Sequence, residues 1–120
     1  MSTNDNSLLI ASAAYTGATT SGSQANPGCS GAHVVINVTV APTAGTITPS
    51  IVGICKGVEY TLLTGAAIST TGITVLKVRP GITAAANASA ADALPQEWRV
   101  DIAHSTTTSF TYSALANLLV

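Results

Sequence analysis

The stretch HVVINVTV, residues 33–40, decides the fold class of this chain. Side chains of an extended chain point alternately to its two faces, so residues two apart share a face. One face of this stretch carries Asn37 and Thr39. The other face is wholly aliphatic and consists of Val34, Ile36, Val38 and Val40. The pattern therefore predicts a β-strand that is buried on one side.

The rest of the sequence is dominated by β-branched residues, and turn signals recur at short intervals, which favours an all-β sandwich or barrel. Six further strands are expected, at residues 7–15, 46–56, 58–68, 73–79, 97–104 and 109–120. Most links between them are short, so we expect two antiparallel sheets packed face to face. The prediction is a single all-β domain over residues 1–120. It is an antiparallel β-sandwich of about seven strands, jelly-roll or immunoglobulin-like, with a polar N-terminal arm at residues 1–6.

Three positions refine this prediction. Lys56 and Gly57 form a tight turn that should join its two flanking strands into a β-hairpin. Pro49 cannot donate a ladder hydrogen bond, so its strand is expected to start late, to bulge there or to lie on a sheet edge. Trp98 shares a face with Val100 and Ile102 and is expected to be buried between the sheets.

One long connection, residues 80–96, follows a Pro-Gly turn and contains mainly Ala, Asn, Ser and Asp. It is expected to cross from one sheet to the other. Its alanines permit a helical turn near residues 90–94, which Pro95 would stop. Long loops in compact domains are usually functional or disordered. Because its side chains are small, we expect this segment to lie flat against the sandwich or against a partner.

The composition narrows the classes of partner. Of 120 residues, 8% are charged, against about 25% in a typical soluble domain, and the net charge is -1. Four basic residues cannot neutralise a run of phosphates, so no nucleic-acid partner is expected. No apolar run approaches the ~20 residues of a membrane span, and no basic residue precedes the short apolar stretch near the N-terminus, so neither a membrane partner nor a signal peptide is expected. The chain is expected to be made in the cytoplasm and to have its surface covered by copies or partners.

The sequence offers little for chemistry, so no enzyme, cofactor or metal site is expected. Asp101 and His104 are three apart in a strand and should point to opposite faces, which is poor spacing for a metal or a proton relay. The PGCSG turn around Cys29 lacks the strand-to-helix setting of a nucleophile turn. Of the two cysteines, Cys29 is expected to be a loop thiol and Cys55 a small buried residue in a strand; their spacing leaves a disulfide between them open.

The C-terminal two-thirds of the chain resembles a group of small proteins encoded by tailed bacteriophages. The resemblance rests on the stretch VRPGITAAAN, on LPQEWRV after it, and on the strand that ends in His104. YTLLTGAAI before this run and FTYSALANLL after it belong to the same pattern. No catalytic residue is part of it. The resemblance implies a structural protein of the virion, namely a capsid decoration or cement protein on the outside of a phage head, assembled in the cytoplasm of the bacterial host.

This resemblance implies two kinds of partner: the major capsid protein, and further copies of the chain, with a trimer favoured over a dimer. The alternative function is a tail-associated or adhesion module that binds a ligand on the host surface. For the decoration protein, the contact is expected on the long connection. Its interface residues are predicted to be Ile82, Ala85, Asn87, Ala88, Ala91 and Leu94.

Overall fold

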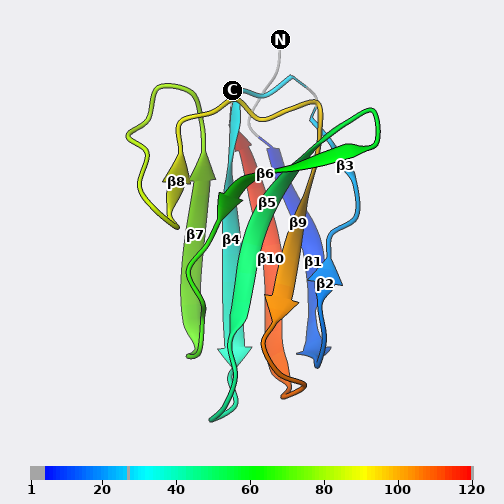
Figure 1. Ribbon diagram of the computed structural model, residues 1–120, viewed down its shortest axis with the longest axis vertical. Coiled ribbons are helices and arrows are strands. Elements are labelled where there is room, and N and C mark those ends of the chain that lie inside the picture. Colours follow the sequence, from blue (N-terminus) through cyan, green and yellow to red (C-terminus); the bar gives the residue numbers. More distant parts are fainter. Residues whose placement is uncertain (1–4, 27, 120) are drawn as a thin grey trace.

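Strand β4, Gly31–Val40, is the strand that HVVINVTV predicts, and it occupies the middle of one of two sheets (Figure 1). The computed structural model describes residues 5–26 and 28–119. These residues form ten strands: β1 Asp5–Tyr15, β2 Thr19–Thr20, β3 Gln24–Ala25, β4 Gly31–Val40, β5 Ile47–Cys55, β6 Val58–Thr64, β7 Gly72–Val78, β8 Ser89–Ala90, β9 Glu97–His104 and β10 Phe110–Leu119. The predicted polar arm at residues 1–6 lies partly outside the described residues, and its end, Asp5 and Asn6, already belongs to β1.

The two sheets pack as a sandwich, which confirms the all-β prediction. Sheet A has the order β1-β10-β4-β7-β8, and sheet B the order β2-β9-β5-β6, with β3 also paired to β9. The long strands pair antiparallel, whereas the two-residue strand β8 runs parallel to β7.

The order of pairing decides between the two sandwich types. If β2 and β3 are taken as one interrupted strand, the first strand pairs with the last, β2 and β3 pair with β9, β4 pairs with β7, and β5 pairs with β6. The chain is therefore one long hairpin, closed at Lys56 and Gly57, that has rolled up into two sheets. With the two-residue strand β8 left aside as an addition beside β7, this is the eight-stranded jelly roll.

The core lies between the sheets. Trp98 is 1% exposed, and Val100 and Ile102 beside it on β9 are equally buried, as predicted. Three of the four aliphatic residues predicted on β4 are also buried, but Val40 is 55% exposed. The ladder between β4 and β10 shifts register between Val38 and Val40, which adds a residue to β4 and turns Val40 away from the core.

The β5–β6 hairpin is confirmed. Its two-residue turn has positive φ at both Lys56 (49°) and Gly57 (83°), the backbone that suits a tight hairpin.

Pro49 lies inside β5, in the middle of sheet B, so the predictions of a late start or an edge position are wrong. The bulge in this pair lies instead between Ile51 and Val52. Opposite Pro49, β6 has ended, and the N–H of Gly65 donates to the Pro49 carbonyl across 2.7 Å. No N–H from residue 49 is needed at this point of the ladder.

Candidate interaction surfaces

The long connection at residues 80–96 is ordered by its own backbone. Ala85 and Ser89 exchange two backbone hydrogen bonds of 3.1 and 3.0 Å around a tight loop in which Asn87 has a φ of 60°. Next, the N–H of Lys77 donates to the Ala88 carbonyl across 3.0 Å, and these bonds continue as the β7–β8 ladder. The predicted helical turn near residues 90–94 is absent, because Ser89 and Ala90 are held as a strand.

The end of this connection is anchored in the core. The side chain of Leu94 is 5% exposed, and its N–H donates to the Ser30 carbonyl across 3.0 Å. The segment crosses from sheet A to sheet B, as predicted. Its order is explained by internal hydrogen bonds and by this anchor, so order alone does not require a partner.

The six predicted interface residues do not all lie at the same surface. Ala85, Asn87 and Ala91 line one groove, whereas Ala88 is exposed and Ile82 half-buried on the same segment. Leu94 must be removed from the predicted interface, because its side chain is part of the hydrophobic core.

The groove lies between β6, which is the edge strand of sheet B, and the connection. We call it the β6 groove; it has a volume of about 660 Å³. Its floor and walls are formed by residues 61–64, 84–87 and 89–92. Asp92 is the charged residue among them. An edge strand beside a wall of small side chains allows a partner backbone to approach closely.

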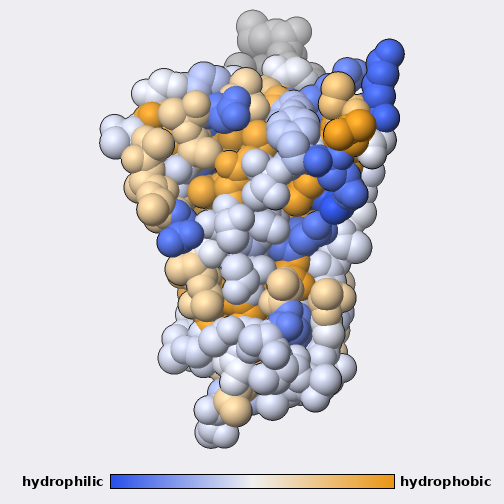
Figure 2. Space-filling model, in the orientation of Figure 1, coloured by the Kyte–Doolittle hydropathy of each residue, from blue (hydrophilic) through white to orange (hydrophobic). Residues whose placement is uncertain are grey.

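Charged side chains gather on the outer face of sheet B. Figure 2 shows this face, with hydrophilic residues concentrated over its upper part and a paler surface towards its lower end. Arg99 forms ion pairs with Glu59 and Asp101. Hydrogen bonds to Asp101 and Glu59 raise the pKa of the Arg99 guanidinium. Arg99 offsets one of the two carboxylates, so the cluster presents a net charge of -1 to a partner.

The outer face of sheet A carries an apolar row that the sequence prediction missed. Leu8, Leu115, Val35 and Val75 are direct cross-strand partners on β1, β10, β4 and β7. We call these four residues the apolar row; Leu8 is 64% exposed, and the others are exposed or half-buried. The signal was present in the sequence, because Val34, Val35 and Ile36 are consecutive and so place an aliphatic residue on both faces of β4.

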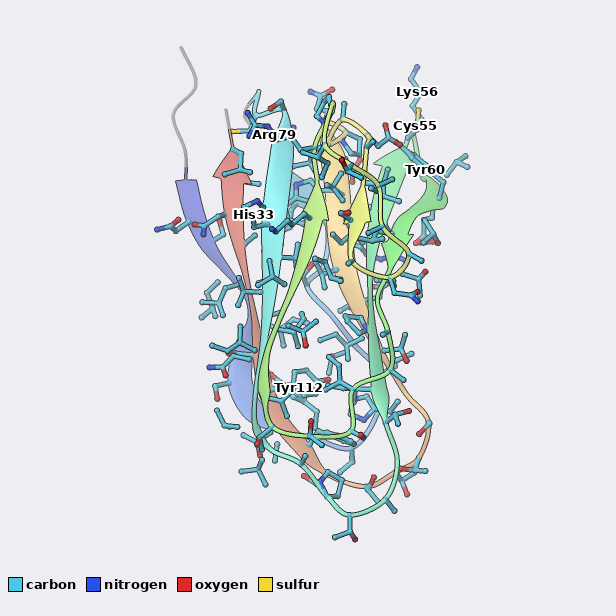
Figure 3. All side chains as sticks on the ribbon, turned by 90° about the vertical axis from the view of Figure 1, so that its left-hand side faces the viewer. His33, Cys55, Lys56, Tyr60, Arg79 and Tyr112 are labelled. Atoms are coloured by element: carbon cyan, nitrogen blue, oxygen red, sulfur yellow. The ribbon has the colours of Figure 1, made fainter. Side chains whose placement is uncertain are left out.

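Next to the apolar row, a polar row crosses the same four strands. It consists of Asn6, Asn117, His33 and Lys77, again as direct cross-strand partners. A hollow of about 380 Å³ lies over β1, β10 and β4, and is lined by residues of both rows. Figure 3 shows the sandwich edge-on, with His33 and Arg79 on sheet A and Cys55, Lys56 and Tyr60 on sheet B.

A half-buried polar cluster lies between the sheets around the buried side chain of Tyr112. The Tyr112 hydroxyl lies 2.6 Å from Oγ1 of Thr19 and 2.9 Å from Nε2 of His104. Nδ1 of His104 is buried without a partner among the described residues. A buried N–H without an acceptor costs more than an unused lone pair, so we place the proton on Nε2, donating to Tyr112, which in turn donates to Thr19.

The cluster favours uncharged groups. Burial lowers the pKa of His104. Burial is also the main cause that raises the pKa of Tyr112. On β9, Asp101 pairs with Arg99 outside the sandwich while His104 contacts Tyr112 inside it, so the two point to opposite faces, as predicted.

Both cysteines are free thiols, and they differ in burial. Cys29 lies in a loop, as expected, but is buried, whereas Cys55, expected to be buried in a strand, is exposed. The reason is position: Cys29 packs against the core beneath its loop, whereas Cys55 ends β5 at the hairpin turn.

Within residues 5–26 and 28–119, no three or more His, Cys, Asp or Glu residues are grouped so that they could hold a metal, and no helix is long and apolar enough to cross a membrane.

The comparison with known proteins identifies the fold. No family model and no curated protein matches the sequence. Among solved structures, the chain is similar to a chain in the structure of infectious bursal disease virus, Gx strain, with a TM-score of 0.54 and 13% sequence identity. The match covers 98% of this chain and 32% of the viral chain, so the present chain spans about a third of that chain's length. At 13% sequence identity, this similarity shows a shared fold alone.

Proposed function

We propose that this chain is a structural protein of a virus particle and that it acts by binding, not by catalysis. The observation that carries this proposal is the similarity of nearly the whole chain to part of a chain in a virus structure. A jelly roll alone does not imply a function, since unrelated activities share it. The low charge of the surface adds support, because contacts between such surfaces require little desolvation of charge.

The more specific proposal is that the chain decorates the head of a tailed phage from outside, by binding the lattice of the major capsid protein. The sequence resemblance to small tailed-phage proteins supports this assignment. Each contact can be weak, because many copies bound to a repeating shell gain through multivalency. Self-association of the chain, with a trimer favoured, belongs to the same proposal.

We assign the capsid contact to the β6 groove. Ala85, Asn87 and Ala91 from the predicted interface line it, and Ile82 and Ala88 lie on the same connection. The groove offers a strand edge and small side chains, which suit an extended, uncharged segment of a partner.

Location can be tested on particles purified from the virus that encodes the chain. Antibodies against the chain, detected by immunogold electron microscopy, should label the head. Labelling confined to the tail would favour the adhesion alternative. A particle without the chain would overturn the virion proposal.

Among the described residues, Tyr60 is the exposed large aromatic, whereas glycan sites generally use several aromatic side chains.

The groove can be tested by rebinding the purified chain to particles from which it has been stripped. A variant with both Ala85→Glu and Ala91→Glu should fold and fail to bind, because it places unpaired charges in the contact. The matched control combines Ala18→Glu and Ala103→Glu, at exposed positions near the opposite edge of sheet B. Equal rebinding of both variants would refute the groove as the capsid contact.

A further inference from the structure

We propose that the outer face of sheet A is a contact between two copies of this chain, related by a two-fold axis parallel to the strands. This inference deepens the proposed self-association and does not depend on the capsid role. Across the sheet, the residues of the apolar row follow in the order Leu8, Leu115, Val35 and Val75.

The order of large and small side chains in the row suits a second copy. A two-fold axis that runs parallel to the strands, midway between β10 and β4, places the apolar row of one copy opposite the apolar row of the second copy. The four residues of the second copy then follow in the reverse order. Leu8 then faces Val75 of the second copy, and Leu115 faces its Val35. Every larger side chain meets a smaller one, so two sheets packed about 10 Å apart can be filled evenly.

The polar row is also compatible with the reversed polar row of the second copy. Lys77 faces Asn6 of the second copy, and His33 faces Asn117. Amide groups both donate and accept, so each can accept a hydrogen bond from an ammonium or an imidazole N–H. The two Lys77 side chains lie at opposite ends of the contact and do not repel each other closely.

The hollow on the face fits the same arrangement. It is lined by Asn6 and Asn117 on one side and by Leu8 and Leu115 on the other. The reversed copy brings its Lys77 and Val75 over these residues. The lysine stem can cover the leucines while the ammonium reaches the amides.

The size of the face predicts a moderate affinity. Four strands about 4.8 Å apart and about ten residues long make a face on the order of 600 Å² per copy. Stable interfaces of standard size bury about 800 Å² per partner. We therefore expect a reversible dimer with a Kd in the micromolar range. A trimer formed through another surface would then assemble in pairs.

Sedimentation equilibrium of the purified chain tests the contact without any particle. At about 100 µM, well above a micromolar Kd, the wild type should have twice the 11.9 kDa mass of one chain, or six times that mass if the proposed trimer also forms through another surface. Leu115→Glu and Val35→Lys should each weaken the dimer by about 100-fold or more, because each buries unpaired charges. Val58→Glu, at an exposed apolar residue away from this face, should remain dimeric.

Mixing the Leu115→Glu and Val35→Lys variants should restore dimers, because the introduced charges then face each other across the axis. A monomeric wild type, a trimer that neither substitution disturbs, or a mixture that stays monomeric would overturn the proposal. Failure to rebind to particles, in contrast, concerns only the capsid role.

Cross-linking with a short bis-maleimide, whose reach suits cysteines on sheets packed about 10 Å apart, tests the direction of the axis and remains informative if a charged variant fails to fold. In a Cys55→Ser background, the Leu8→Cys and Val75→Cys variants should cross-link to each other when mixed. Self-linking of the Leu8→Cys variant in preference to this mixed pair would overturn the arrangement, because it requires an axis across the strands.

Discussion

The side-chain amide of Asn26 donates to the carbonyl oxygen of Leu94 across 3.1 Å and so ties the end of the long connection to the loop before β4. The same amide donates to the Cys29 carbonyl across 2.7 Å, and its oxygen accepts from the N–H groups of Cys29 and Gly28. One half-buried side chain therefore joins two loops at the same end of the sandwich.

Replacing Asn26 should loosen this end of the molecule. Asn26→Ala removes four hydrogen bonds and leaves half-buried groups unsatisfied, so we expect unfolding to become easier by about 2–4 kcal/mol. Hydrogen exchange should also become faster at the amide of Leu94, which donates to the Ser30 carbonyl. Gln96→Ala, at an exposed side chain nearby, is the control and should change neither. Unaltered exchange at the Leu94 amide in Asn26→Ala would contradict a role of the Asn26 side chain in holding this end of the connection.

Trp98 should contribute more to stability than the exposed aromatic Tyr60. Trp98→Ala is expected to lower the free energy of unfolding by about 3–5 kcal/mol, because it leaves a cavity between the sheets. Trp98→Phe should cost clearly less, since it keeps a buried ring and removes an indole N–H that has no partner among the described residues.

Urea unfolding measures these differences. Tyr60 is 44% exposed, so Tyr60→Ala should stay within about 1 kcal/mol of the wild type. A similar loss in the Tyr60 and Trp98 alanine variants would contradict the core position of Trp98.

Stability should decrease as the pH falls below about 6.5, the ordinary pKa of histidine. Burial lowers the pKa of His104 in the folded state. At pH values between that lowered pKa and 6.5, the unfolded state binds more protons than the folded state. The free energy of unfolding therefore rises with pH in this range and falls on acidification. The pKa of His33 is lowered too, by burial and then by Lys77 and Arg79.

Urea unfolding at pH about 7.5 and about 5.5, on either side of the histidine range, should show this loss. His104→Gln should reduce it, and a variant that also carries His33→Gln should reduce it further. The same pH dependence in the wild type and the double variant would exclude both histidines as its source.

The two thiols should differ in reactivity. Cys55 is exposed and should react with a thiol reagent in the native protein, whereas buried Cys29 should react only on unfolding. Labelling in denaturant without reductant should modify both. Mass spectrometry of the labelled protein counts the modified thiols, and Cys55→Ser identifies the fast one. Rapid native labelling of the Cys55→Ser variant would contradict the burial of Cys29.

Most of the fold could be predicted from local patterns. Alternation identified the strands around Val34, Val100 and Ile102, and the Lys56–Gly57 turn identified the hairpin. These features depend on neighbours in the chain, since a strand's faces are set by its two-residue period and a tight turn by the φ of two residues. The predicted sandwich and the position of Trp98 followed from them.

The candidate surfaces depended on pairing between distant strands. The apolar row joins Leu8, Val35, Val75 and Leu115, which come together only because β1 and β10, at opposite ends of the described chain, are neighbours in sheet A. The same holds for Leu94, which looked like an interface residue in a small-residue loop and lies in the core.

What the sequence by itself determined is the period of each strand, the turn that closes the long hairpin and the scarcity of charge. What only the tertiary structure decided is which strands lie side by side, which way the Val40 side chain turns after the bulge and which thiol is buried. The physical reason is that strand register and burial arise from contacts between residues far apart in the chain, and each local pattern is compatible with several of them.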